Sequence, residues 1–251
     1  MRIVVIGGTG LIGARLVPTL REYGYEAVAA SRCSGVDTFL GDGLADVVQG
    51  AAAVVDASDS SSPEGAEAMA FFMTSTRNLL AAEAQAGVRH HVALSVVGAE
   101  RLQESGYMRA KMKQESLVRE SPIPYSIVRA TQFFEVMKSI AAAATAGNTI
   151  RLAPVLFQPM AAKDVARALG KVSVGEPLNG ILEVAGPEPF RLDQLVRDAL
   201  KEHQDPREVV LDLESRYFGA RLSERSLMPA EGAQLGEMRF RDWLRQPVLQ
   251  P

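Results

Sequence analysis

Apolar residues along the chain fall into short runs that alternate with longer stretches of helical spacing. Short runs rich in β-branched residues are typical of buried strands, and apolar residues three or four positions apart are typical of helices. The short runs predict strands at Arg2–Ile6, Glu26–Ala30, Val36–Leu40, Ala53–Asp56, His91–Ser95 and Tyr125–Arg129. The helical spacing predicts helices at Leu11–Tyr23, Leu44–Gln49, Glu64–Ala86, Ser105–Glu120 and Gln132–Ala146. This alternation predicts an α/β fold with a doubly wound parallel sheet.

Beyond Gly147 the alternation is looser. The pattern predicts strands near Thr149–Leu152 and Ile181–Val184 and helices near Ala161–Val172 and Arg191–His203. We therefore expect a core formed by residues 1–150 and a smaller lobe formed by residues 151–251, interleaved with the core rather than a separate domain. Open α/β sheets bind ligands at the carboxyl ends of their strands, so the lobe is expected to pack there and hold a substrate.

A glycine-rich turn, Gly7-Gly-Thr-Gly-Leu-Ile-Gly13, lies between the first strand and the first helix. It fits both G-x-x-G-x-x-G and G-x-G-x-x-G, in the context that a dinucleotide-binding Rossmann fold requires. Glycines allow a tight turn and a close backbone approach, and the free amides at a helix start attract phosphate. The residues expected to bind the pyrophosphate are Gly7, Thr9, Gly10, Leu11, Ile12 and Gly13. The alternative is a tight turn without a ligand.

The end of the second strand indicates which dinucleotide is preferred. NAD-selective sites usually carry an acid there, whereas this strand ends in Ala30, Ser31 and Arg32. The Arg32 guanidinium and the Ser31 hydroxyl suit a 2′-phosphate, so NADP(H) is expected in preference to NAD(H). Asp42 is a candidate for binding the adenine amine, and it is equally suited to cap the following helix.

Tyr107 and Lys111 are four residues apart on a predicted helix, and Ser95 ends the strand before it. Carbonyl reduction needs a proton donor, and a nearby ammonium lowers the pKa of a tyrosine. The interpretation is that Tyr107 acts as acid, Lys111 tunes it and binds the nicotinamide ribose, and Ser95 polarises the substrate oxygen. A surface Tyr–Lys pair is the alternative.

Composition excludes several classes of protein. The 251 residues carry a net charge of −3 with no basic stripe, so a nucleic-acid partner is not expected. No apolar run is long enough to span a membrane, and no Cys/His cluster predicts a metal site. With Cys33 as the one cysteine, no intrachain disulfide is possible, which fits a cytoplasmic protein. The sequence leaves open whether the protein is a monomer or a homodimer.

These motifs resemble the short-chain dehydrogenase/reductase superfamily, in particular its atypical NmrA-like, NAD(P)H-binding branch, from Met1 to about Val184. The resemblance is carried by Gly7–Gly13, Asn78–Val88, Leu94–Gly98, Tyr107–Lys111 and Pro124–Phe134, with Asp164–Ala166 as a further similarity. It implies NAD(P)(H) binding and a Ser–Tyr–Lys triad, which here would be Ser95, Tyr107 and Lys111. Some NmrA-like members lack the tyrosine and act as redox-state regulators.

The expected function is therefore an NADP(H)-dependent oxidoreductase that transfers a hydride between the nicotinamide and a small carbonyl or quinone. Thr131, Phe133 and Phe134 follow a strand and are candidates to line the substrate pocket, although the two phenylalanines are equally suited to the core. The segment Tyr217–Pro229 is a candidate lid. The alternatives are a redox-sensing regulator without turnover and an isomerase of the sugar-nucleotide epimerase type.

Overall fold

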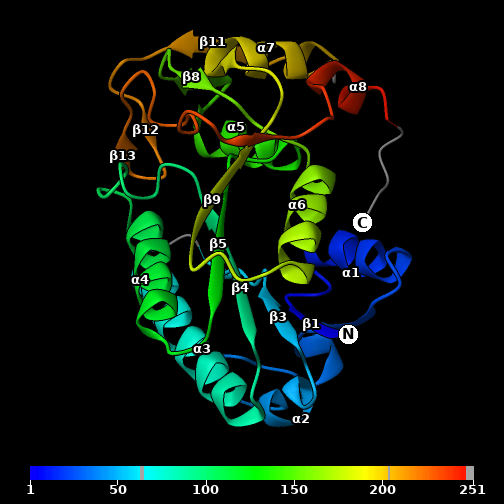
Figure 1. Ribbon diagram of the computed structural model, residues 1–251. Coiled ribbons are helices and arrows are strands. Elements are labelled where there is room, and N and C mark those ends of the chain that lie inside the picture. Colours follow the sequence, from blue (N-terminus) through cyan, green and yellow to red (C-terminus); the bar gives the residue numbers. More distant parts are fainter. Residues whose placement is uncertain (63–64, 203, 247–251) are drawn as a thin grey trace.

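The computed structural model describes residues 1–62, 65–202 and 204–246. At its centre lies a parallel sheet of seven strands, which runs through the middle of Figure 1. In spatial order the strands are β14 (Gln234–Leu235), β9 (Gly180–Ala185), β5 (Tyr125–Ala130), β4 (His90–Val96), β3 (Ala53–Asp56), β1 (Arg2–Ile6) and β2 (Glu26–Ala30). Every neighbouring pair is parallel. The prediction of a Rossmann-type α/β fold is confirmed.

Helices cover both faces of the sheet (Figure 1). One face carries α1 (Gly13–Glu22) and α6 (Ala162–Val174), and the other carries α2 (Leu44–Val48), α3 (Gly65–Ala86) and α4 (Gly106–Glu120). Neighbouring residues of β1 serve opposite faces: Val4 packs with Leu79 of α3, and Val5 packs with Leu16 of α1 and Leu169 of α6. Because both faces are buried, β1 and β3 each carry a single polar residue, Arg2 and Asp56.

The predicted strand Val36–Leu40 is wrong, because no strand of the sheet forms there. The carboxylate of Asp37 accepts hydrogen bonds from the amides of Phe39 and Leu40, at 2.8 and 3.1 Å. A side chain that bonds its own backbone in this way competes with strand pairing. Gly35, with a φ of 80°, also turns the chain just before the segment. A short 3₁₀ helix, η1 (Arg32–Ser34), precedes this turn.

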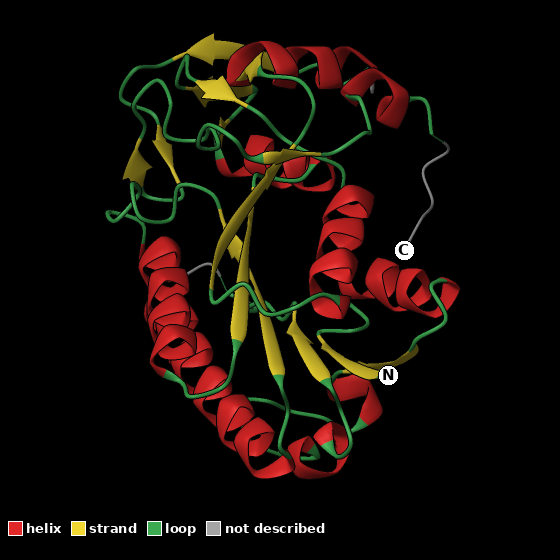
Figure 2. Ribbon diagram, in the orientation of Figure 1, coloured by secondary structure: helices red, strands yellow, loops and turns green. Residues whose placement is uncertain are grey.

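The smaller lobe lies above the carboxyl edge of the sheet and is a mixture of short strands and helices (Figure 2). Its elements are η2 (Phe134–Val136), α5 (Met137–Ala143), β6 (Thr145–Ala146), β7 (Thr149–Leu152), β8 (Leu156–Phe157), β10 (Phe190–Arg191), α7 (Leu192–Glu202), β11 (Glu208–Leu211), β12 (Arg216–Tyr217), β13 (Ala220–Arg221) and α8 (Phe240–Leu244). One apolar cluster holds these elements together, with Phe134, Phe157 and Leu195 at 1% exposure or less. The single helix predicted at Gln132–Ala146 is instead η2 followed by α5.

The chain beyond residue 150 also contributes to the core. Strands β9 and β14 extend the central sheet, and α6 packs against α1 on one of its faces. The expected first residue of α3, Glu64, and the expected last residue of α7, His203, lie outside the described residues. Within the described ranges, no helix is long and apolar enough to cross a membrane.

His90 makes the stability of the fold sensitive to acid. Its Nε2 lies 2.8 Å from the Ser126 hydroxyl, and that oxygen accepts a hydrogen bond from the amide of Leu178, so the neutral imidazole accepts the hydroxyl proton. Burial, and secondarily the charge of His91, lowers the pKa of His90 to about 4. Because the unfolded chain binds this proton near pH 6.5, stability present above pH 6.5 is lost as the pH falls towards 4.

We predict that the free energy of unfolding falls by about 2–3 kcal/mol between pH 7 and pH 4 because of this histidine alone. Denaturant titrations of the wild type and of His90→Gln at several pH values measure this loss of stability. Both proteins carry the same carboxylates, so the difference between their pH dependences reports His90. The same slope in both proteins would show that His90 does not titrate in this way.

Candidate active site

A cavity of about 990 Å³ opens at the carboxyl ends of the central strands. The glycine turn after β1, the end of β2, the loop 57–62 after β3, the end of β4 and the start of α4 all line it. Residues of α3, residues after β5, and Val136, Ser139 and Phe218 of the smaller lobe complete the wall. The cavity lies where an open α/β sheet binds its ligands, and its volume suits a ligand of dinucleotide size.

The glycine turn forms a cradle without side chains. Gly7 has a φ of 71°, and a Cβ there would lie 2.7 Å from the carbonyl oxygen of Ala57. A Cβ at Gly13 would lie 2.2 Å from the carbonyl oxygen of Gly7, so the absence of a side chain here lets the start of α1 pack closely on the turn. Gly13 itself does not line the cavity, whereas Gly7, Thr9, Gly10, Leu11 and Ile12 do. The open amides at the start of α1 suit a pyrophosphate.

Ser31 and Arg32 line one end of the cavity, directly after β2. Arg32 is exposed, and in the described part of the chain its guanidinium makes no ion pair. A guanidinium at this position is available to a phosphate group. These two residues therefore fit the 2′-phosphate of NADP(H).

Asp42 does not line the cavity, in contrast to the expectation that it binds adenine. Its backbone carbonyl accepts a hydrogen bond from the amide of Asp37 at 2.9 Å, which closes the turn described above. The capping alternative is not observed either, because the N-cap of α2 is Gly43. Within that turn, Asp37, Phe39 and Leu40 line the cavity instead.

Tyr107 lies in the first turn of α4 and lines the cavity. Its hydroxyl donates a hydrogen bond to Asp59 Oδ1 at 2.9 Å, and its ring packs edge-on against Phe72 at 5.9 Å between centroids. Burial, then the charge and the hydrogen bond of Asp59, raise the pKa of Tyr107 well above its ordinary value. The prediction that Lys111 lowers the pKa of Tyr107 is therefore wrong for this arrangement, in which the phenol stays protonated.

Lys111 lies one turn further along α4, and its ammonium is fixed from three sides. It donates to the carbonyl oxygen of Leu94 at 2.8 Å and to Gln114 Oε1, and it lies 4.3 Å from the centre of the Phe72 ring. Gln114 in turn donates to Asp56 Oδ2 at 2.9 Å. Burial lowers the pKa of Lys111, although nearby carboxylates oppose the shift. The structure thus brings Tyr107 and Lys111 to the same cavity, as the spacing predicts.

Ser95 also lines the cavity, but its hydroxyl donates to Glu115 Oε1 at 2.7 Å. Arg129 binds both oxygens of the same carboxylate at 2.8 Å, and Arg119 binds Oε2. Burial would raise the pKa of Glu115, yet the hydrogen bonds from Arg129 and Ser95 outweigh it and the pKa is lowered. The proton of Ser95 is therefore held by a charged carboxylate and is not offered to a substrate oxygen.

The three expected substrate residues separate in the structure. Thr131 and Phe133 line the cavity, and the Thr131 hydroxyl is buried with no hydrogen-bond partner among the described residues. Phe134 does not line it: its ring is 1% exposed and packs against Phe240 and Trp243 at 5.3 and 5.4 Å. Its assignment to the substrate pocket is therefore wrong, and the core alternative is confirmed. The two side chains leave the backbone in different directions, because Phe133 is extended, with φ −92° and ψ 148°, and Phe134 begins η2.

Several lining residues were not found from the sequence. The loop 57–62 contributes Asp59, the hydrogen-bond partner of Tyr107, and α3 contributes Phe71. The position of this loop directly after β3 was the available signal, because ligands bind at strand ends. Phe218 belongs to the segment Tyr217–Pro229, the predicted candidate lid, whereas Ser139 had no signal because it reaches the cavity through the packing of the smaller lobe.

A glycine cradle at the carboxyl edge of a doubly wound parallel sheet defines a dinucleotide-binding protein. Residues 7–172 match the model of the NAD(P)H-binding family. This match spans more than half of the chain, and the chain belongs to that family. No curated protein matches the sequence significantly.

Solved structures of the same fold include both reductases and epimerases. An NADPH-dependent quinone oxidoreductase from Escherichia coli, complexed with NADPH, is 21% identical, with 84% of this chain and 77% of that chain covered and a TM-score of 0.65. A UDP-glucose 4-epimerase from Thermus thermophilus, in complex with NAD, is 18% identical over 98% and 97% of the two chains, with a TM-score of 0.73. A dTDP-4-dehydrorhamnose reductase from Bacillus anthracis, in complex with NADP, is 15% identical over 96% and 92%, with a TM-score of 0.67.

Proposed function

We propose that this protein is an NADP(H)-dependent oxidoreductase of the atypical, NmrA-like type that reduces a small carbonyl or quinone. One observation carries the proposal: Tyr107 and Lys111 line the same cavity as the glycine turn and Arg32. A proton donor therefore lies in the cavity whose opposite end suits a 2′-phosphate. The similarity to the quinone oxidoreductase of Escherichia coli supports a quinone as one substrate class.

Each residue has a physical role in this proposal. When bound, the nicotinamide supplies a hydride. Tyr107 gives its hydroxyl proton to the substrate oxygen, for which it first leaves Asp59. Lys111 keeps a positive charge beside the developing phenolate and is held in place by Leu94 and Gln114. The apolar walls, including Phe71 and Phe133, exclude water from the reacting atoms.

Thr131, rather than Ser95, is the group we assign to the substrate oxygen. Its hydroxyl is buried, lines the cavity and has no partner among the described residues, so it is free to donate. A buried hydroxyl without a partner costs free energy that a bound acceptor would restore. Ser95 does not contact the substrate in this proposal. Its hydroxyl donates to Glu115, which also binds Arg129, and this network fixes the end of β4.

The test measures the consumption of NADPH with each member of a panel of quinones and aldehydes. The loss of absorbance of the reduced nicotinamide reports the reaction. We expect turnover of at least one quinone or aldehyde by the wild type. A panel without turnover, together with saturable cofactor binding, would reject the enzyme and leave the dinucleotide site intact.

A redox-sensing regulator without turnover is the second candidate. The observation that favours it is the hydrogen bond from Tyr107 to Asp59, which holds the catalytic proton away from a substrate. This candidate predicts that the affinities for oxidised and reduced cofactor differ and that no member of the panel is reduced. The oxidoreductase predicts turnover, so the same panel separates the two.

Arg32→Gln is expected to raise the Kd for NADPH by about 10- to 100-fold and to leave the Kd for NADH within about twofold. The reason is that a charge-assisted hydrogen bond contributes about 1.5–3 kcal/mol and that only NADPH carries the 2′-phosphate. Arg77→Gln is the matched control, because Arg77 is exposed on α3 and does not line the cavity. An equal loss for both cofactors would show that Arg32 does not select between them.

A further inference from the structure

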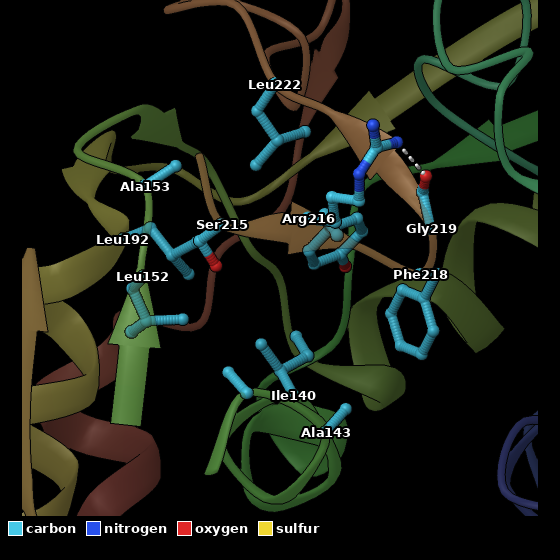
Figure 3. Close-up of a pocket in the computed structure, with 12 residues that line it drawn as sticks. Ile140, Ala143, Leu152, Ala153, Leu192, Ser215, Arg216, Phe218, Gly219 and Leu222 are labelled. Carbon is cyan, nitrogen blue, oxygen red and sulfur yellow. Dashed lines mark hydrogen bonds between the residues drawn. The ribbon is translucent and has the colours of Figure 1, made fainter. Parts of the chain in front are cut away.

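A second, smaller cavity lies in the lobe between α5 and the β12–β13 hairpin (Figure 3). Its volume is about 150 Å³. Figure 3 shows Ile140 and Ala143 of α5 below it, Leu152 and Leu192 at one side, and Phe218 at the other. Ser215 and Arg216 also line it, so the wall is apolar on the side of α5, Leu152 and Leu192 and polar along the start of β12. An apolar cavity of this size takes up a single benzene ring in a well-studied engineered case. The apolar side of this cavity therefore suits a group of about five or six carbon atoms.

The two cavities are neighbours. Phe218 lines both of them. Helix α5 and the turn before it also serve both, since Val136 and Ser139 line the larger cavity and Ile140 and Ala143 line the smaller one. Phe218, which is 39% exposed, thus lies at the boundary between the site of the proposed reaction and the second cavity.

The backbone at this partition is unusual. Phe218 has a φ of 47° and Gly219 a φ of 87°, and the pair forms the two-residue turn between β12 and β13. Asn and Gly are the usual residues at such positions, and a bulky side chain at positive φ is strained. Strain of this kind is retained where the side chain has a task. Here that task is to line both cavities.

Tyr217, the preceding residue, lines the smaller cavity and is 5% exposed. Its hydroxyl is buried with no hydrogen-bond partner among the described residues. It packs in the same apolar cluster as Tyr107, and it is close enough for its charge to raise the pKa of Tyr107. An unpartnered hydroxyl beside an apolar cavity is a place for a hydrogen-bond acceptor of a ligand.

We propose that the smaller cavity binds an apolar substituent of the substrate, five or six carbon atoms long, with an oxygen that accepts from Tyr217. The Phe218 ring moves aside to admit this substituent while the reducible carbonyl stays beside Tyr107. The inference rests on the proposed function for its substrate class, and it narrows that class to carbonyl compounds or quinones with an alkoxy or similar side chain.

The first experiment measures kcat/KM for 2-alkoxy-1,4-benzoquinones with chains from methyl to octyl. The value is expected to rise about fourfold for each added methylene, the effect of about 0.8 kcal/mol per buried CH₂, and to level off near six carbons. In Ala143→Leu, which adds three carbon atoms to the α5 wall of the cavity, the ratio between the hexyl and methyl compounds is expected to collapse at least tenfold. Ala142→Leu is the control, because Ala142 is the next residue on the same helix, is exposed like Ala143 and lines neither cavity.

The second experiment separates this inference from the proposed function, because it needs no turnover. Calorimetry with the NADP⁺-loaded protein compares 4-hexyloxyphenol with 4-heptylphenol, which has a methylene in place of the ether oxygen. The readout is the ratio of the two affinities, ether over methylene compound, because the methylene compound is the more hydrophobic of the two. Tyr217→Phe is expected to lower this ratio about fivefold relative to the wild type, the worth of one hydrogen bond. Melting temperatures report whether Tyr217→Phe folds.

If the wild type binds the ether and Ala143→Leu binds it more weakly, the second cavity is supported even when no quinone is reduced. In that case only the proposed reaction fails. Conversely, turnover with the same chain-length dependence in the wild type and in Ala143→Leu would overturn the second cavity alone. The same affinity ratio in the wild type and in Tyr217→Phe would overturn the role of the Tyr217 hydroxyl.

Discussion

Tyr107→Phe is expected to lower kcat for quinone or carbonyl reduction by about 10²- to 10⁴-fold, the usual contribution of a positioned general acid. The substitution removes the proton that the first turn of α4 offers to the cavity and keeps the ring that packs on Phe72. The Kd for NADPH is expected to stay within about threefold, because the phenol is not part of the glycine cradle. Stopped-flow single turnovers at saturating NADPH measure the chemical step directly.

Asp59→Asn is the companion variant. Burial and the Asp59 carboxylate together raise the pKa of Tyr107, so removing the charge is expected to lower that pKa. Reduction needs the protonated phenol, and activity is lost as the pH rises through its pKa. The alkaline limb of the pH–rate profile is therefore expected to move to lower pH in Asp59→Asn. Full activity of Tyr107→Phe, or an unmoved limb in Asp59→Asn, would contradict the role of Tyr107 as acid.

Gly13→Ala is expected to weaken NADPH binding at least 100-fold. A Cβ at this position would lie 2.2 Å from the carbonyl oxygen of Gly7 and 2.6 Å from Gly8 Cα, so the turn and α1 must separate. The amides that suit the pyrophosphate lie in this turn, and their alignment depends on that contact. Fluorescence titration with NADPH measures the change.

Gly10→Ala is the matched control, because it adds the same methyl group in the same turn. Its Cβ would meet the Gly7 carbonyl oxygen at 3.3 Å, which requires a much smaller adjustment. Its effect on the Kd is expected to be at least tenfold smaller than that of Gly13→Ala, and melting temperatures of both variants verify folding. Equal affinity of folded Gly13→Ala and wild type would contradict the cradle.

The sheet could be predicted from the sequence because its strands are buried on both faces. That environment makes the apolar runs nearly continuous, as in Arg2–Ile6 and Ala53–Asp56, and the flanking helices are long enough to show their period. The predicted strand Val36–Leu40 failed because Asp37 bonds the following amides, a local competition that apolar periodicity does not register.

The parts of the site whose residues lie close together in the chain were also predictable. The residues Gly7–Gly13 form one turn, and Tyr107 and Lys111 lie on one helix, so local geometry sets both arrangements. The partners of these groups come from other segments: Asp59, in the loop after β3, accepts the hydrogen bond of Tyr107, and Glu115 of α4 accepts that of Ser95. Such contacts depend on how α4 packs on the sheet, and for that reason neither the direction of the Tyr107 pKa nor the orientation of Ser95 could be derived from spacing.

The central claim is that the cavity above the glycine turn binds NADP(H), and isothermal titration calorimetry with purified protein tests it most directly. The account predicts one saturable site for NADPH, with NADH bound at least tenfold more weakly. An absence of saturable heat for both cofactors at millimolar concentration would contradict it.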